Sequence, residues 1–182
     1  MEKIYISLIR LFANIPEIIL INIFLIVATY TDCKSMKIYN KFNLVMLITR
    51  CVFFVVLAIF YKNLISAQYI FDCLFGGVVL CLAFWIPAAI AKDSIGGDIK
   101  FAFNLGIWCG VIPALFIALI ATLLNFFYRI IFGKKEDKEF HFQKIFNYGY
   151  IPFNATARVP LAPFFYVGYI CLFVAHFFVP TV

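Results

Sequence analysis

Ile95-Gly96-Gly97-Asp98-Ile99-Lys100 lies between two long apolar runs, residues 69–91 and 99–132. A carboxylate between two runs of this length sits beside a bilayer, and the two glycines before it let another backbone or a substrate come close. A second acid, Asp32, ends the first strongly apolar run of the chain. Ionisable groups at membrane depth are costly, so they are read first as functional. We therefore expect Asp32 and Asp98 to act as partners.

The composition is that of an integral membrane protein. The chain has 182 residues, of which 65% are hydrophobic and 13% charged, and its mean hydropathy is +1.03. A soluble domain has about 45–50% apolar and about 25% charged residues. At roughly 20 residues per spanning helix, about six crossings use most of the length. The sequence therefore predicts an all-α, polytopic membrane protein with about six transmembrane helices, as a single domain over residues 1–182.

Other classes of protein are disfavoured by the charge and cysteine patterns. The net charge is +6, but the basic residues lie in loops between apolar runs, where topology explains them better than nucleic-acid binding does. The six cysteines are scattered and form no Cys-x-x-Cys pair, which supports neither a zinc module nor a disulfide framework. His141 and His176 are isolated. We expect no metal site and no nucleic-acid partner.

The apolar runs also predict where the helices lie. A first helix starts at Asn14-Ile15-Pro16-Glu17, where an Asn cap is followed by early Pro and Glu. Residues 99–132 exceed one span, and we expect a break near residues 109–113, between a short helix and a full one. The other expected helices cover residues 42–61, 69–91 and 161–179. Residues 1–14 are expected to form an interfacial helix, and residues 133–158 a cytoplasmic loop.

The distribution of basic residues sets the expected orientation. If Asp32 faces the cytoplasm, only Lys3, Arg10 and Lys62 lie in outside segments, and the other loop lysines and arginines lie inside. The positive-inside rule then puts both termini outside and the Asp32 and Asp98 ends on the cytoplasmic face of the cell membrane.

Two neighbouring carboxylates can hydrolyse a peptide bond. One acts as a general base that activates water, and the other, protonated, polarises the scissile carbonyl; the pair shares a proton because two close acids do not both ionise readily. Structural interpretations remain open. Asp32 could simply end a helix among lysines, and Asp98 could cap the helix that follows it. Glu17 fits the first turn of a helix and needs no function.

Arg50 lies inside an otherwise apolar run, residues 42–61. A cation in such a place either snorkels to the membrane rim or faces the protein interior. The sequence leaves both alternatives open.

Three landmarks in order resemble the type IV prepilin peptidase family, which includes the archaeal preflagellin peptidases. In that family an Asp is followed six residues later by Ile-Pro-Asn, and here Asp32 is followed by Ile38-Tyr39-Asn40. The family's Gly-x-Gly-Asp-x-Lys looks like Ile95-Gly96-Gly97-Asp98-Ile99-Lys100. Its late Pro-Phe-Gly-Pro-Phe segment is similar to Pro160-Leu161-Ala162-Pro163-Phe164. The resemblance covers about residues 16 to 180.

The resemblance implies a membrane-embedded aspartic endopeptidase that removes the short leader of type IV pilin-like or archaeal flagellin-like precursors. It implies a substrate partner in the bilayer, no cofactor, and no methyltransferase activity, because the chain lacks the family's cysteine-paired insertion. The implied catalytic residues are Asp32 and Asp98, and the implied substrate-binding or supporting residues are Gly96, Gly97, Lys100 and Asn40.

Two positions depart from the family pattern: Ile95 stands where the family has its first motif Gly, and Tyr39 replaces the Pro. Ile95 favours one alternative, a catalytically inactive assembly protein of the same fold. A small proton- or cation-coupled transporter component is the other alternative, because acids of such proteins lie along ion pathways.

Overall fold

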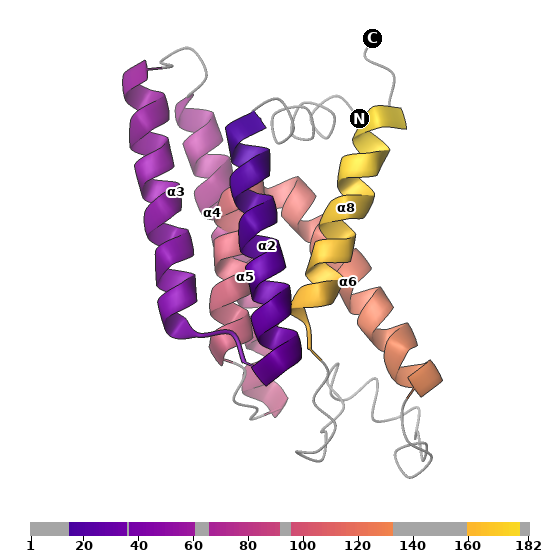
Figure 1. Ribbon diagram of the computed structural model, residues 1–182. Coiled ribbons are helices and arrows are strands. Elements are labelled where there is room, and N and C mark those ends of the chain that lie inside the picture. Colours follow the sequence, from indigo (N-terminus) through magenta and orange to yellow (C-terminus); the bar gives the residue numbers. More distant parts are fainter. Residues whose placement is uncertain (1–14, 36, 61–65, 92–95, 133–159, 179–182) are drawn as a thin grey trace.

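The computed structural model describes residues 15–35, 37–60, 66–91, 96–132 and 160–178. All regular structure within these ranges is α-helical, as the sequence predicts. The expected interfacial helix at residues 1–14 and the expected loop at residues 133–158 lie outside them. The helices are α2 (Ile15–Ser35), α3 (Asn40–Phe60), α4 (Ala67–Ala91), α5 (Gly96–Cys109), α6 (Val111–Phe132) and α8 (Ala162–Phe178) (Figure 1).

Four of these helices, α2, α3, α4 and α6, are long and apolar enough to cross a membrane. The apolar part of α8, Ala162–His176, is shorter. α5 has 14 residues and rises about 21 Å at 1.5 Å per residue, less than the roughly 30 Å of a bilayer core. The protein is therefore a polytopic helical membrane protein, and two of the six expected helices are shorter than a full crossing.

The apolar side chains sort into a core and an outer surface. Ile21, Leu25, Met46, Phe101 and Phe165 are fully buried between helices. Many other large apolar side chains are exposed, as expected for residues that face lipid tails rather than water. The bundle thus has a packed interior and a lipid-facing surface that are both apolar.

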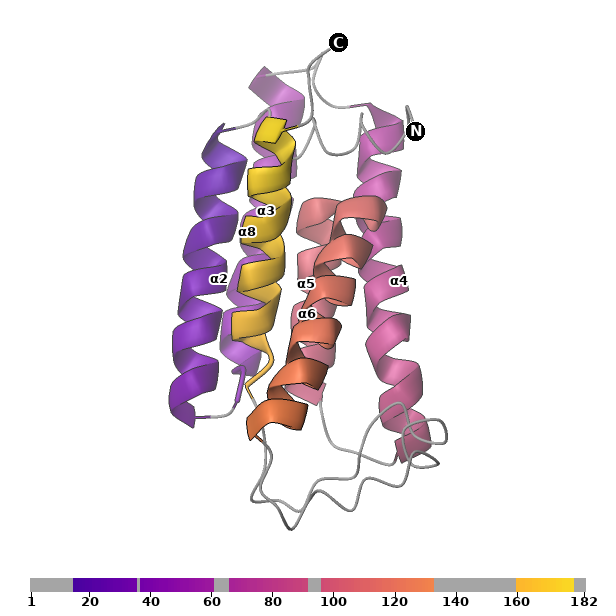
Figure 2. The same ribbon diagram turned by 90° about the vertical axis from the view of Figure 1, so that its right-hand side faces the viewer.

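α5 and α6 are separated by one residue, Gly110, whose φ of 78° belongs to the left-handed region that glycine adopts readily. The break between residues 109 and 113 expected from the sequence is confirmed. In the side view the α5–α6 turn lies well below the upper ends of α2, α4 and α8 (Figure 2). The chain therefore reverses inside the bundle rather than at its rim.

Small residues allow α5 to pack closely on α4, its most extensively contacted neighbour. A Cβ placed on Gly76 would lie only 2.7 Å from the carbonyl oxygen of Gly106, so the two backbones are in direct contact there. Close approach of this kind drives helix association in membranes, where lipid is as apolar as the helix surface.

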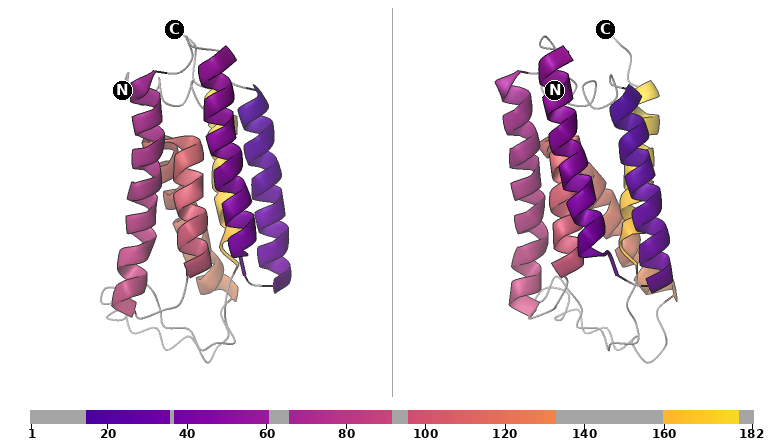
Figure 3. Two further views of the ribbon diagram at one scale, coloured as in Figure 1. Left: turned by 90° about the vertical axis from the view of Figure 1, so that its left-hand side faces the viewer. Right: turned by 60° about the vertical axis from the view of Figure 1, so that its left-hand side comes forward.

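One end of the bundle collects the segments that carry the three sequence landmarks. α2, α4 and α6 end there, and α3, α5 and α8 begin there (Figures 1 and 3). Asp32 lies in the last turn of α2 and Asp98 in the first turn of α5. The alternation of helices thus brings both acids to the same end.

Candidate active site

Asp32 is buried, with 3% of its surface exposed. Its Oδ2 accepts hydrogen bonds from the backbone N–H of Leu161 at 2.7 Å and of Ala162 at 2.9 Å. The first N–H groups of a helix have no partner within the helix, so the carboxylate caps the start of α8. Asp32 is therefore more than a solvated helix end among lysines.

Both bonds fall on Oδ2, and among the described residues none is donated to Oδ1. Two donors on one oxygen fix the orientation of the carboxyl group. The contact also joins two of the sequence landmarks, the first acid and the Pro160-Leu161-Ala162-Pro163 segment, which are 129 residues apart.

The first and second landmarks meet at Gly97. A Cβ on Gly97 would lie 2.8 Å from the carbonyl oxygen of Ile38, so only glycine lets the α2–α3 connection approach this closely. The side-chain amide of Asn43 donates a hydrogen bond to the Gly97 carbonyl at 3.2 Å. A Cβ on Gly96 would meet no atom within 4 Å. The close approach expected of the two glycines thus applies to Gly97, and Gly96 faces open space.

Lys100 and Asn40 also come together. Lys100 Nζ donates to Asn40 Oδ1 at 2.9 Å, and both residues are exposed. The exposed pair links the start of α3 to the beginning of the second turn of α5, at the same end of the bundle. Both residues are thus adjacent to the Gly97 contact.

Asp98 is the third residue of α5 and is partly exposed. It lies within the first helical turn rather than at the cap position that was the structural alternative for it. A carboxylate in a first turn is favoured by the partial positive charge at the helix N-terminus. Asp98 is thus the more solvent-accessible of the two acids.

Two asparagines support this end of the bundle, and the sequence reasoning did not single them out. Asn43 and Asn104 are buried, with 4% and 3% of their surfaces exposed. Asn104 Nδ2 donates to the Asn43 carbonyl at 2.9 Å, while Asn43 bonds to Gly97. The signal was present in the sequence, because an amide inside an apolar run needs a partner on another helix.

Arg50 faces the protein interior and is fully buried, which resolves the alternative left open by the sequence. Its partners include Glu17, which lies in the first turn of α2 as expected but is also buried. This ion pair lies toward the other end of α2 from Asp32. Within the described ranges, no cluster of three or more His, Cys, Asp or Glu side chains could hold a metal ion.

The fold and site define a class: a polytopic helical membrane protein with two acids at one end, one of them buried against a helix N-terminus. The type IV leader peptidase family matches residues 19–130, from α2 to α6, including Asp32 and Asp98. This is more than half of the chain, and the protein belongs to that family. Comparison with curated proteins and with solved structures gave no match.

Proposed function

We propose that this protein is a membrane-embedded aspartic endopeptidase whose catalytic dyad is Asp32 and Asp98. One observation carries the proposal: the family match includes both acids, which lie at the same end of the helical bundle. Membership of a leader peptidase family supplies the reaction class, and the two carboxylates supply the groups that acid–base hydrolysis needs.

In the proposed reaction one carboxylate takes a proton from water while the oxygen of that water attacks the scissile carbonyl carbon. The other carboxyl group donates its proton to the carbonyl oxygen, giving a tetrahedral diol. Proton transfer to the amide nitrogen then breaks the C–N bond and restores the carbonyl. Asp32 is oriented by α8, and the connection that follows it lies against Gly97, one residue before Asp98.

The proposed substrates are type IV pilin-like or archaeal flagellin-like precursors with a short leader ahead of an apolar helix. The surplus of lysine and arginine in the loops at the Asp32 and Asp98 end favours a cytoplasmic position for that end. Gly96, Gly97, Lys100 and Asn40 are proposed to support the extended leader strand. We propose peptide-bond hydrolysis alone, with neither methyl transfer nor a cofactor.

The test is cleavage of a co-expressed pilin-like precursor in membranes by the wild type, Asp32→Asn and Asp98→Asn. Asparagine keeps the shape of the side chain but cannot exchange the proton, so we expect processing by the wild type and by neither of these two variants. Asp72→Asn is the matched control, since Asp72 lies near the start of α4, at the other end of the bundle.

Cleavage that persists in Asp32→Asn or Asp98→Asn would contradict the dyad. A folded wild type that cleaves none of several leader-bearing precursors would favour the inactive assembly protein instead.

A further inference from the structure

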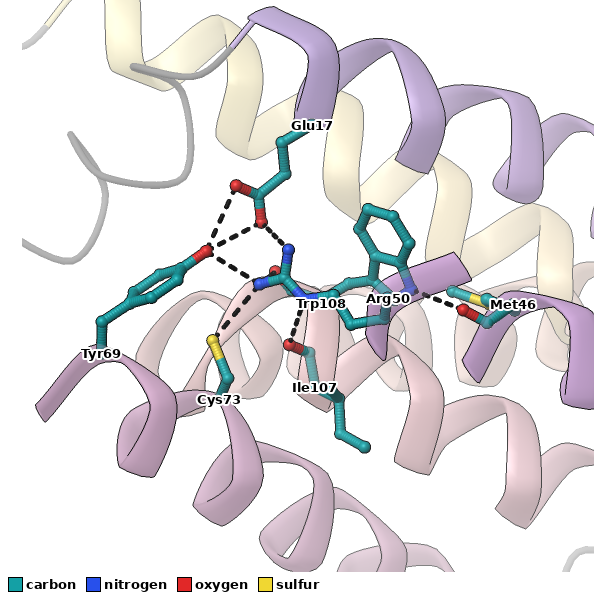
Figure 4. A network of polar contacts seen from close by, with 7 residues as sticks. All are labelled: Glu17, Met46, Arg50, Tyr69, Cys73, Ile107 and Trp108. Carbon is teal, nitrogen blue, oxygen red and sulfur yellow. Dashed lines mark hydrogen bonds and ion pairs between the residues drawn. The ribbon is translucent and has the colours of Figure 1, made fainter. Parts of the chain in front are cut away.

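A second polar cluster lies away from the proposed active site, around the guanidinium group of Arg50 (Figure 4). The Arg50 cluster consists of side chains from α2, α3 and α4, together with two backbone carbonyls of α5. Its members are Glu17, Arg50, Tyr69, Cys73, Ile107 and Trp108. The proposed chemistry at Asp32 and Asp98 makes no use of it.

The Arg50 cluster supplies hydrogen-bond donors to the last carbonyl groups of α5. The chain turns at Gly110, so the last carbonyl groups of α5 lack the partners that a continuing helix would supply. Arg50 Nε donates to the Ile107 carbonyl at 3.2 Å, and Arg50 Nη2 donates to the Trp108 carbonyl at 3.2 Å. Irregular backbone at membrane depth is tolerated where protein satisfies its polar groups. Arg50 thus acts as the C-terminal cap of α5.

The same guanidinium group is held from the other side by α2 and α4. Arg50 Nη1 bonds to Glu17 Oε1 at 2.5 Å, and Nη2 donates to the Tyr69 hydroxyl at 2.8 Å. The Tyr69 hydroxyl in turn donates to Glu17. The ring of Phe54 lies 4.3 Å and that of Trp108 4.9 Å from the guanidinium carbon. Every part of the planar cation therefore has a fixed partner.

The helices joined in this way carry the two acids. α2 bears Glu17 near its start and Asp32 in its last turn, and α5 bears Asp98 in its first turn and the Trp108 carbonyl near its end. α2 and α5 are not among the helix pairs with extensive backbone contact. The path Glu17–Arg50–Trp108 links them through polar bonds, and the Phe24 and Trp108 rings, 5.6 Å apart, add an apolar contact.

We propose that Arg50 is a positioning residue for catalysis, which holds α2 and α5 in fixed relative register and so sets the separation of Asp32 and Asp98. The proposal rests on the proposed function, because it assumes that these two acids react together. Both helices transmit the constraint as rigid rods. When the tie at one end is cut, the helices slide or tilt, and the acids at the other end separate.

The test is double electron–electron resonance, which measures the distance between two spin labels placed beside Asp32 and Asp98. One label is attached to Cys33, which is exposed beside Asp32, and the other to Gly96→Cys, where a Cβ meets no neighbour. Cys51, Cys81 and Cys171 are replaced by serine, and the buried Cys73 and Cys109 are kept. The distance distribution is compared in lipid nanodiscs between the background protein and the same protein carrying Arg50→Leu.

Leu57→Ala is the matched control. Leu57 is buried on α3 about two turns beyond Arg50, so its truncation weakens packing on the same helix without removing a polar tie. Arg50→Lys is a second variant, which keeps a positive charge for Glu17. A single ammonium group cannot replace the fork that reaches Glu17 and both carbonyls together.

We expect a broadened or shifted distance distribution in Arg50→Leu and Arg50→Lys, and an unchanged one in Leu57→Ala. In unlabelled protein with native Gly96, kcat should fall about a hundredfold in Arg50→Leu, as for a misplacement of about 1 Å. KM should stay unchanged, because the cluster lies away from the proposed substrate end.

A wild-type distance distribution in a folded Arg50 variant would overturn the proposal and leave the cluster a purely structural cap. If Arg50→Leu does not fold, Arg50→Lys decides by the same criterion. A wild type that cleaves no precursor would refute the proposed function, whereas the distance measurement would still decide whether Arg50 couples the two helices.

Discussion

Asp32 has a structural task besides its proposed catalytic one, and the two tasks can be separated by choosing the substitution. Its Oδ2 accepts hydrogen bonds from the backbone N–H groups of Leu161 and Ala162, where α8 begins, at 2.7 and 2.9 Å, in a buried position. Asp32→Asn keeps a carbonyl oxygen that can accept both bonds. Asp32→Ala removes the acceptor and leaves two N–H groups without a partner. We expect both variants to be inactive but only the alanine variant to loosen α8.

The magnitude follows from the geometry. Replacing a helix N-cap by alanine costs about 0.5–2 kcal/mol, and a buried donor left unsatisfied costs about 1–3 kcal/mol. Because Asp32 serves two donors, we expect Asp32→Ala to destabilise the start of α8 by about 2–4 kcal/mol. Asp32→Asn loses only the charge at the helix N-terminus, which is worth about 0.3–1 kcal/mol at ordinary sites.

Hydrogen exchange measured by mass spectrometry on peptides that cover the first turn of α8 checks this prediction. At 1.4 kcal/mol per tenfold change, a loss of about 3 kcal/mol speeds exchange of the Leu161 and Ala162 amides by roughly a hundredfold. Asp32→Asn should change it less than about tenfold. Equal protection of these amides in the alanine and asparagine variants would refute the assignment of Asp32 as the cap of α8.

Other substitutions test the close contacts of α5. Gly97→Ala places a Cβ 2.8 Å from the Ile38 carbonyl oxygen and should cost about 1–3 kcal/mol, as overpacking does. Gly96→Ala, its matched control, should change the thermal midpoint in nanodiscs by the equivalent of less than about 0.5 kcal/mol. Gly110→Ala forces a Cβ into a left-handed position 2.5 Å from Asp72 Oδ2, and should cost about 1–3 kcal/mol. Adding Asp72→Ala should recover only the part of the lost stability that comes from the clash, because the left-handed backbone remains unfavourable for alanine. A double variant as stable as the wild type would contradict this account, and so would a Gly110→Ala variant that loses no stability.

Much of the helical layout could be predicted, because its signals are local. The break at Gly110 follows from a glycine and a nearby proline that punctuate an apolar segment too long for one span. The start of α2 follows from the Pro and Glu of its first turn. Composition alone indicated a membrane protein, since lipid is the only solvent in which so many apolar side chains can stay exposed.

The polar partners could not be predicted, because they depend on which helix faces meet in space. The sequence places Arg50 either at the membrane rim or in the protein interior, and it indicates only an ordinary first-turn acid at its partner Glu17. Their ion pair joins positions 33 residues apart, on helices whose rotation no local pattern sets. The bond from Leu161 to Asp32 spans 129 residues for the same reason. The dyad itself stays a prediction until the cleavage assay is done.

The two helices that carry the acids are each tied at both ends by polar bonds. α2 is held through Asp32 at one end and Glu17 at the other, and α5 through the Gly97 carbonyl and the Trp108 carbonyl. In a bilayer, burial of apolar surface does little to choose one helix arrangement over another, because lipid tails are as apolar as leucine. Hydrogen bonds to backbone groups at fixed positions do make that choice. The sparse polar residues inside these apolar helices therefore fix the arrangement that brings Asp32 and Asp98 to one end of the bundle, and the proposed two-carboxylate reaction depends on it.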